Sequence, residues 1–120
     1  MIDTNNLVHA PLKTGVLGTC VIADNQHEYE VAEMTRKCSH EGRQADASFF
    51  ATARNAFAAQ MEYGWIAVLI NQGIHRGCWR VVTVHEDDAK MMLISGNTFP
   101  DPFTALAAAY ERKKRQEGKP

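Results

Sequence analysis

The sequence predicts an α+β domain in the order β-β-α-β-β-β-α, with one antiparallel sheet and both helices packed on one face of it. Short apolar, β-branched segments occur on both sides of a stretch with helical spacing. A second helix has a clear start at Asp101. With 120 residues, 45% hydrophobic and 22% charged, the chain has the size and composition of one globular domain.

The first two strands are expected to form a hairpin. Residues 16–22 are apolar and β-branched, residues 27–34 alternate between apolar and polar, and Asp24 and Asn25 between them favour a turn. Residues 1–13 have no periodicity, so we expect a flexible leader followed by a domain over 14–117 and a tail over 118–120.

The first helix is expected over residues 45–62. Its apolar positions recur every four residues, at Ala45, Phe49, Ala53, Phe57 and Met61. Gly64 is suited to end the helix. We therefore expect Phe49, Phe57 and Leu106 to share one core.

Three strands are expected at residues 65–71, 78–85 and 90–95. The first is a continuous apolar run, which favours a central position in the sheet. A glycine-bounded loop over 72–77 and an acidic turn over 86–88 connect the three.

The second helix carries its own start signal. Asp101 can accept hydrogen bonds from the first turn, and Pro102 fits the first helical position, where no N–H is needed. Phe103, Leu106 and Tyr110 are expected on its buried stripe.

Charge and cysteine content point to a cytoplasmic protein. A net charge of −1 predicts no general attraction to nucleic acid or to a membrane surface. The longest apolar run, over 65–70, is too short to span a bilayer, and the N-terminus lacks the pattern of a signal peptide. Three widely spaced cysteines favour free thiols in a reducing compartment.

No motif of a known catalytic, metal or cofactor site is found. Cys38 and His40 could offer ligands from a polar segment, but their spacing is not that of a zinc site. We therefore predict a protein that is not an enzyme, with no metal, no catalytic residue and no cofactor.

Two groups of residues are candidates for binding. His75, Arg76, Trp79 and Arg80 form the candidate protein-contact surface, because Trp and Arg are frequent interface anchors. The alternative is that Trp79 packs beneath the helices.

The candidate nucleic-acid contact consists of Arg112, Lys113, Lys114 and Arg115. The predicted α-β-β-β-α order from residue 45 onward is that of double-stranded-RNA-binding domains, but those have a basic start to the second helix. Here the basic residues lie at its end, where they also complement the helix dipole.

Four segments resemble small accessory proteins of temperate bacteriophages and prophages. Residues 29–34 (YEVAEM) and 45–55 (ADASFFATARN) are similar to a strand and a helix of those proteins, and residues 96–100 and 105–109 are similar to their ends. The resemblance implies a phage or prophage origin and a setting in the cytoplasm of a bacterial host cell. It implies no catalytic residue.

These observations favour a non-enzymatic accessory protein that binds and modulates a host protein, a class that includes inhibitors of host defence. The alternative is a nucleic-acid-associated module that uses the basic end of the second helix. A small enzyme is the third hypothesis.

Overall fold

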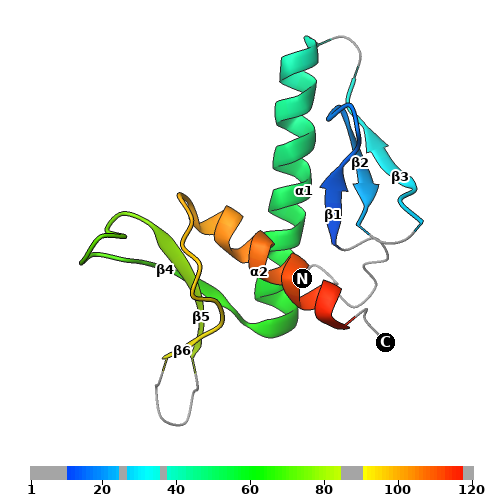
Figure 1. The fold of residues 1–120 in the computed structure, drawn as a ribbon. Coiled ribbons are helices and arrows are strands. Elements are labelled where there is room, and N and C mark those ends of the chain that lie inside the picture. Colours follow the sequence, from blue (N-terminus) through cyan, green and yellow to red (C-terminus); the bar gives the residue numbers. More distant parts are fainter. Residues whose placement is uncertain (1–10, 25–26, 36–37, 85–90, 118–120) are drawn as a thin grey trace. The chain divides into compact units, whose positions relative to one another are not determined.

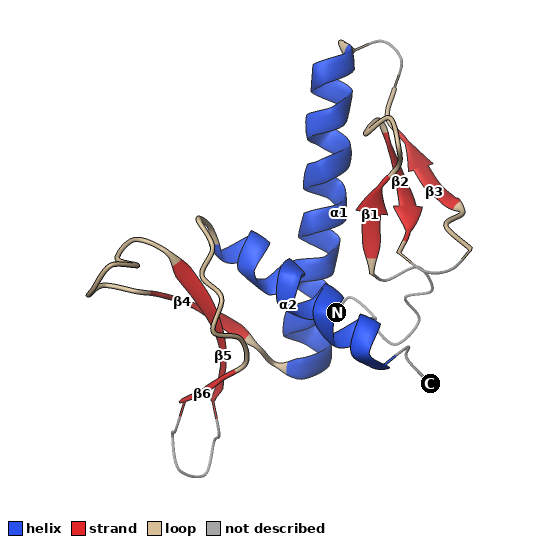
Figure 2. Cartoon of the chain, viewed as in Figure 1, coloured by secondary structure: helices blue, strands red, loops and turns tan. Residues whose placement is uncertain are grey.

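The computed structural model describes residues 11–24, 27–35, 38–84 and 91–117, and Figures 1 and 2 show the fold. The elements are β1 (Leu12–Thr14), β2 (Cys20–Ala23), β3 (Glu30–Glu33), α1 (His40–Tyr63), β4 (Ile66–Leu69), β5 (Trp79–Val84), β6 (Met91–Leu93) and α2 (Pro102–Glu117). The chain divides into two compact units, Met1–Asn55 and Ala56–Pro120, and α1 contributes residues to both. The α+β class is confirmed.

The strands form two antiparallel sheets, ordered β1-β2-β3 and β4-β5-β6, where the sequence predicted one. The predicted order of elements is otherwise matched, with β1 as an added first strand. Each sheet is a meander, because strands that follow one another in the chain pair as neighbours.

Strand β1 lies partly inside the predicted leader. Leu12 is fully buried and packs in one cluster with Val21, Ala47 and Ala51. The folded part of the chain therefore starts before residue 14, and residues 1–10 lie outside the described ranges. A three-residue strand is too short to show a sequence period, so only its pairing with β2 reveals it.

A side chain of α1 completes the hydrogen bonding of β1. Asn55 is fully buried, its Nδ2 donates to the Leu12 carbonyl oxygen at 2.7 Å, and the Leu12 N–H donates to its Oδ1 at 2.8 Å. Because β1 is an edge strand, these backbone groups have no strand partner on that side. Asn55 thus covers an edge that would otherwise hold two buried, unpaired groups.

Helix α1 begins at His40, five residues before the predicted start. Ser39 caps it, since its Oγ accepts a hydrogen bond from the Gly42 N–H at 3.1 Å. The predicted end is confirmed: Gly64 has a φ of 68°, and its N–H donates to the Gln60 carbonyl at 2.9 Å.

The buried face of α1 is lined by alanine, not by phenylalanine. Ala47 and Ala51 are buried in the first unit, whereas Phe49 is 75% exposed and Phe57 is 39% exposed. The prediction that Phe49 and Phe57 share a core with Leu106 is therefore wrong, although Leu106 itself is buried. The alanine and phenylalanine stripes are offset by two residues, which places them about 200° apart around the helix.

In the second sheet the central strand is β5, and the apolar run that was predicted to be central forms the edge strand β4. Val81 and Val82 are both buried at the middle of β5. Two consecutive hairpins necessarily put the middle strand at the centre. The loop over 72–77 is confirmed, and Gly73 and Gly77 adopt φ values of 82° and 89° that favour glycine. The predicted acidic turn lies outside the described ranges.

The predicted start of α2 is confirmed. Asp101 Oδ1 accepts from the Thr104 N–H at 2.8 Å, and its Oδ2 accepts from the Thr104 hydroxyl at 2.6 Å. These hydrogen bonds lower the pKa of Asp101. Leu106 and Tyr110 are buried as expected, but Phe103 is 61% exposed and does not join the stripe. Among the described residues, neither helix is long and apolar enough to cross a membrane.

Replacing Asn55 with Ala should lower the free energy of unfolding by about 2–4 kcal/mol, because the Leu12 N–H and carbonyl would stay buried without partners.

Asn55→Asp keeps the acceptor but points a carboxylate at the Leu12 carbonyl, which raises the pKa of that carboxyl in the folded state. Its destabilisation should therefore grow as pH rises above about 4, where the unfolded-state carboxyl ionises. Chemical denaturation at several pH values measures both effects. Gln60→Ala on exposed α1 surface is the control, and a pH-independent loss in Asn55→Asp would contradict the hydrogen-bond assignment.

The revised core makes a second prediction. Leu106→Ala should cost about 2–5 kcal/mol, the usual range for a buried leucine. Phe49→Ala should cost less than about 1 kcal/mol, because most of its ring already contacts solvent. Equal losses for the two variants, measured by denaturant titration, would show that the phenylalanine face is buried after all.

Candidate functional site

The four residues of the predicted protein-contact surface do not lie on one surface. His75 and Arg76 are exposed in the 72–77 loop, and Trp79 is half-buried at the start of β5. The Trp79 backbone pairs with Phe99, with N···O distances of 2.7 and 2.9 Å. Side chains alternate along a strand, so Trp79 and the exposed Arg80 point to opposite faces of the sheet.

Arg80 belongs to a face of the second sheet that carries apolar side chains in contact with solvent. Paired residues of antiparallel strands share a face, and the register places Ile66 beside Val82, Val68 beside Arg80 and Met91 beside Val84. Leu93 lies beside Val82 on the same face. We call this set the outer sheet face: Ile66, Val68, Arg80, Val82, Val84, Met91 and Leu93.

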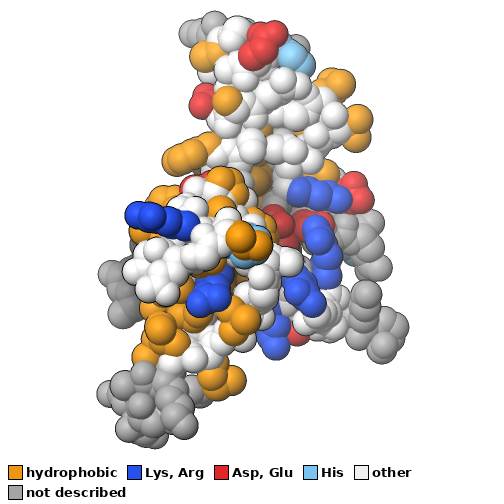
Figure 3. All heavy atoms as spheres, turned by 60° about the vertical axis from the view of Figure 1, so that its left-hand side comes forward, with side chains coloured by type: hydrophobic (Ala, Val, Ile, Leu, Met, Phe, Trp, Pro, Cys, Tyr) orange, Lys and Arg blue, Asp and Glu red, His pale blue; other side chains and the backbone are white. Residues whose placement is uncertain are grey.

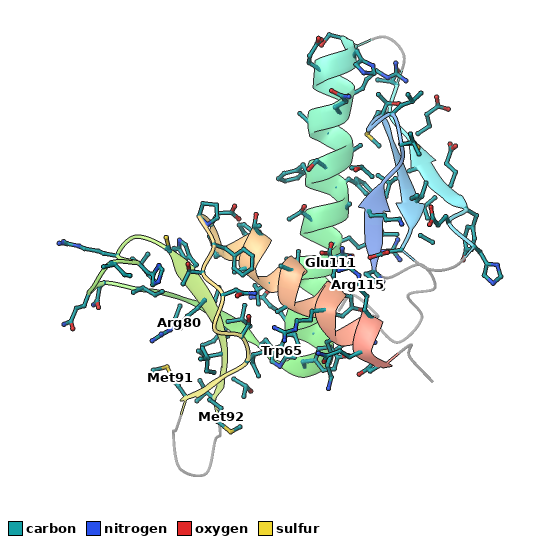
Figure 4. The ribbon with its side chains drawn as sticks, in the orientation of Figure 1. Trp65, Arg80, Met91, Met92, Glu111 and Arg115 are labelled. Carbon is teal, nitrogen blue, oxygen red and sulfur yellow. The ribbon has the colours of Figure 1, made fainter. Side chains whose placement is uncertain are left out.

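Much of the outer sheet face is open to solvent. Ile66 is 40% exposed, Val84 is 46% exposed and Met91 is 65% exposed. Figure 4 shows Arg80 and Met91 projecting to one side of the sheet, while Trp65 lies on the other side next to α2. Figure 3 shows hydrophobic side chains gathered over these strands. The alternation of side chains along a strand defines the two sides of β5 from sequence, but not which side α2 leaves open.

The predicted nucleic-acid contact is divided among different parts of α2. Lys114 is occupied within the fold: its Nζ lies 3.0 Å from Glu62 Oε2 and 3.6 Å from Glu117 Oε2, and over the rings of Tyr63 and Tyr110. The Tyr110 hydroxyl donates to Glu62 Oε1 at 2.9 Å, and the Tyr63 hydroxyl donates to Glu117 Oε1 at 3.1 Å.

The electrostatics of this cluster keep Lys114 charged. Burial by itself lowers the pKa of Lys114, but hydrogen bonds to Glu62 and Tyr63 outweigh it, so the pKa is raised. Burial and the adjacent Glu62 carboxylate both raise the pKa of Tyr110. Lys114 therefore joins α2 to the end of α1 as a structural cation.

Arg112 and Lys113 lie on another side of α2, where they line a cavity of about 280 Å³. Its wall consists of Trp65, Leu93, Ile94, Ser95, Ala109, Arg112, Lys113 and Gln116. Glu111 and Arg115 lie about 150° and 110° around the helix from the centre of the cavity-lining residues of α2, and both side chains are turned away from Trp65 (Figure 4). Sequence spacing predicts that Ala109, Arg112, Lys113 and Gln116 share a face, but nothing local indicates that Trp65 and Ile94 lie opposite them.

The described ranges contain no cluster of three His, Cys, Asp or Glu side chains that could hold a metal ion. Cys38 is exposed ahead of α1, and Cys20 and Cys78 are half-buried free thiols.

Comparison of this chain with protein-family models, with curated proteins and with solved structures finds no match. The residues that the structure describes form two small antiparallel sheets and two helices, which is an α+β fold. The resemblance to phage accessory proteins stays a prediction.

The adjacent residues Lys113 and Lys114 make a matched test of this geometry. Lys114→Gln should lower the free energy of unfolding by about 1–3 kcal/mol, because Glu62 loses its charged hydrogen-bond partner. Lys113→Gln should change it by less than about 0.5 kcal/mol. A double-mutant cycle of Lys114→Gln with Glu62→Gln, followed by urea denaturation, should show coupling between the two. Additive losses would contradict the ion pair.

Proposed function

We propose that this chain is a non-enzymatic binding protein that attaches to a partner protein through the outer sheet face. The observation that carries the proposal is the solvent exposure of Ile66, Val84 and Met91 on one face of the β4–β6 sheet. Contiguous apolar surface on a soluble domain marks an interaction site, because covering it removes water from that surface at about 25 cal/mol per Å².

The composition of the face supports a protein partner. Met and Arg are enriched in protein interfaces, and Met91 offers an adaptable apolar side chain while Arg80 offers a charged one. Val82, between them, is 4% exposed and provides a packed base. The expected partner therefore has an apolar patch with an acidic group at its edge, placed to face Arg80.

The identity of the partner class rests on the resemblance stated above. A phage or prophage accessory protein acts in the cytoplasm of its bacterial host, so we propose a host protein as the partner, with host-defence proteins as the first class to test. The resemblance supports this choice, and the sheet face supports the mode of binding.

The neighbouring residues Met91 and Met92 supply the experiment. They are 65% and 50% exposed and project to opposite sides of β6 (Figure 4). We expect Met91→Glu to weaken binding of a host protein, isolated with the unmodified chain and measured by calorimetry, about tenfold or more. Met92→Glu should leave the affinity within about threefold, and unchanged melting curves should show that both variants fold.

Equal binding by both variants would contradict the outer sheet face as the site. If the captured material is nucleic acid, and the affinity falls steeply with salt, the proposal is wrong and the nucleic-acid alternative is favoured.

A further inference from the structure

The cavity beside α2 combines an apolar wall with a cationic rim. Trp65, Ile94 and Ala109 contribute to the wall, and Arg112, Lys113 and Gln116 contribute side chains from consecutive turns of α2. At about 280 Å³, the cavity is slightly smaller than the usual small-molecule site of about 300–1,000 Å³. It suits a small organic molecule better than a large cofactor.

The charge of the rim selects the ligand. Arg112 and Lys113 are exposed, and no ion pair to either is found within the described ranges. The nearest acidic side chains are directed elsewhere: Glu111 lies on the opposite side of the helix, and Glu117 contacts Lys114 and Tyr63. The C-terminal end of α2 carries about half a negative unit charge from the helix dipole, which repels an anion. The two full positive charges of Arg112 and Lys113 outweigh this repulsion.

The cavity also offers uncharged hydrogen-bond donors. Ser95 is buried, and its Oγ accepts a hydrogen bond from the Asn97 N–H at 3.2 Å, which leaves the hydroxyl proton to donate. The Gln116 amide provides a second neutral donor. An acidic group can thus receive hydrogen bonds in addition to charge, and Arg112 can bind it through two parallel N–H groups.

We propose that this cavity binds a small organic anion with a flat apolar body. The body lies against Trp65 and Ile94, and the acidic group, a carboxylate or a phosphate monoester, lies between Arg112 and Lys113. This site shares only Leu93 with the outer sheet face and takes its charge from α2, so it goes beyond the proposed protein-binding function and can be tested separately.

Titration of the ¹⁵N-labelled protein with 2-naphthoate, 2-naphthyl phosphate and neutral 2-naphthol tests the proposal. At least one anion should shift the Trp65 indole signal and the amides of Ser95, Ala109 and Gln116 in a saturable way. The anion that binds with the higher affinity shows whether the site prefers a carboxylate or a phosphate. Neutral 2-naphthol should have an affinity at least about tenfold lower, because it cannot form the charged hydrogen bonds.

The double variant Arg112→Gln, Lys113→Gln should weaken anion binding about tenfold or more, whereas Arg115→Gln, whose side chain does not line the cavity, should not. Met91→Glu should also leave anion binding unchanged, which separates this site from the outer sheet face. Four results would overturn the proposal: no saturable shift, equal affinity for 2-naphthol, equal loss in Arg115→Gln, or tighter binding of a DNA duplex to the same amides.

Discussion

Alanine packing is the constraint on which the rest of this structure depends. Of the sixteen buried hydrophobic residues in the described ranges, nine are alanines. Each buries a single methyl group, worth about 0.8 kcal/mol, so the energy gained per residue is small. What alanine allows is the close approach of a helix backbone to its neighbours, as where Ala47 and Ala51 meet Leu12 and Val21.

An interior of small side chains gives greater weight to polar contacts that set position. In the unit Met1–Asn55, the buried amide of Asn55 binds both backbone groups of Leu12 and holds the edge strand on α1. In the unit Ala56–Pro120, Glu62 binds both Lys114 and Tyr110, which holds α2 on the end of the same helix. Each of these contacts fixes the position of a helix as well as stabilising the fold, because a displaced helix would leave the hydrogen-bonding groups unpaired.

The same constraint shapes the surface. Faces lined with alanine are buried, so larger apolar side chains such as Phe49 and Phe103 are left in contact with solvent. In the second unit, α2 packs on one side of the sheet and the other side presents Ile66, Val84 and Met91. This unit therefore offers an apolar surface for a protein and, beside α2, a cationic cavity for a small anion. The two differ in chemistry and share only Leu93.

The sequence by itself determined the features that depend on contacts within a few residues. The α+β class, the cap at Asp101, the helix end at Gly64 and the 72–77 loop follow from local backbone chemistry, which acts in the same way in any fold. Tertiary structure decided which face of α1 is buried, that β5 rather than β4 is central, and that Leu12 belongs to a sheet. It also separated Lys114 from Lys113, since one meets Glu62 and the other a cavity wall. These outcomes depend on partners distant in the chain, and a periodic pattern shows that a side of an element is apolar without showing what will cover it.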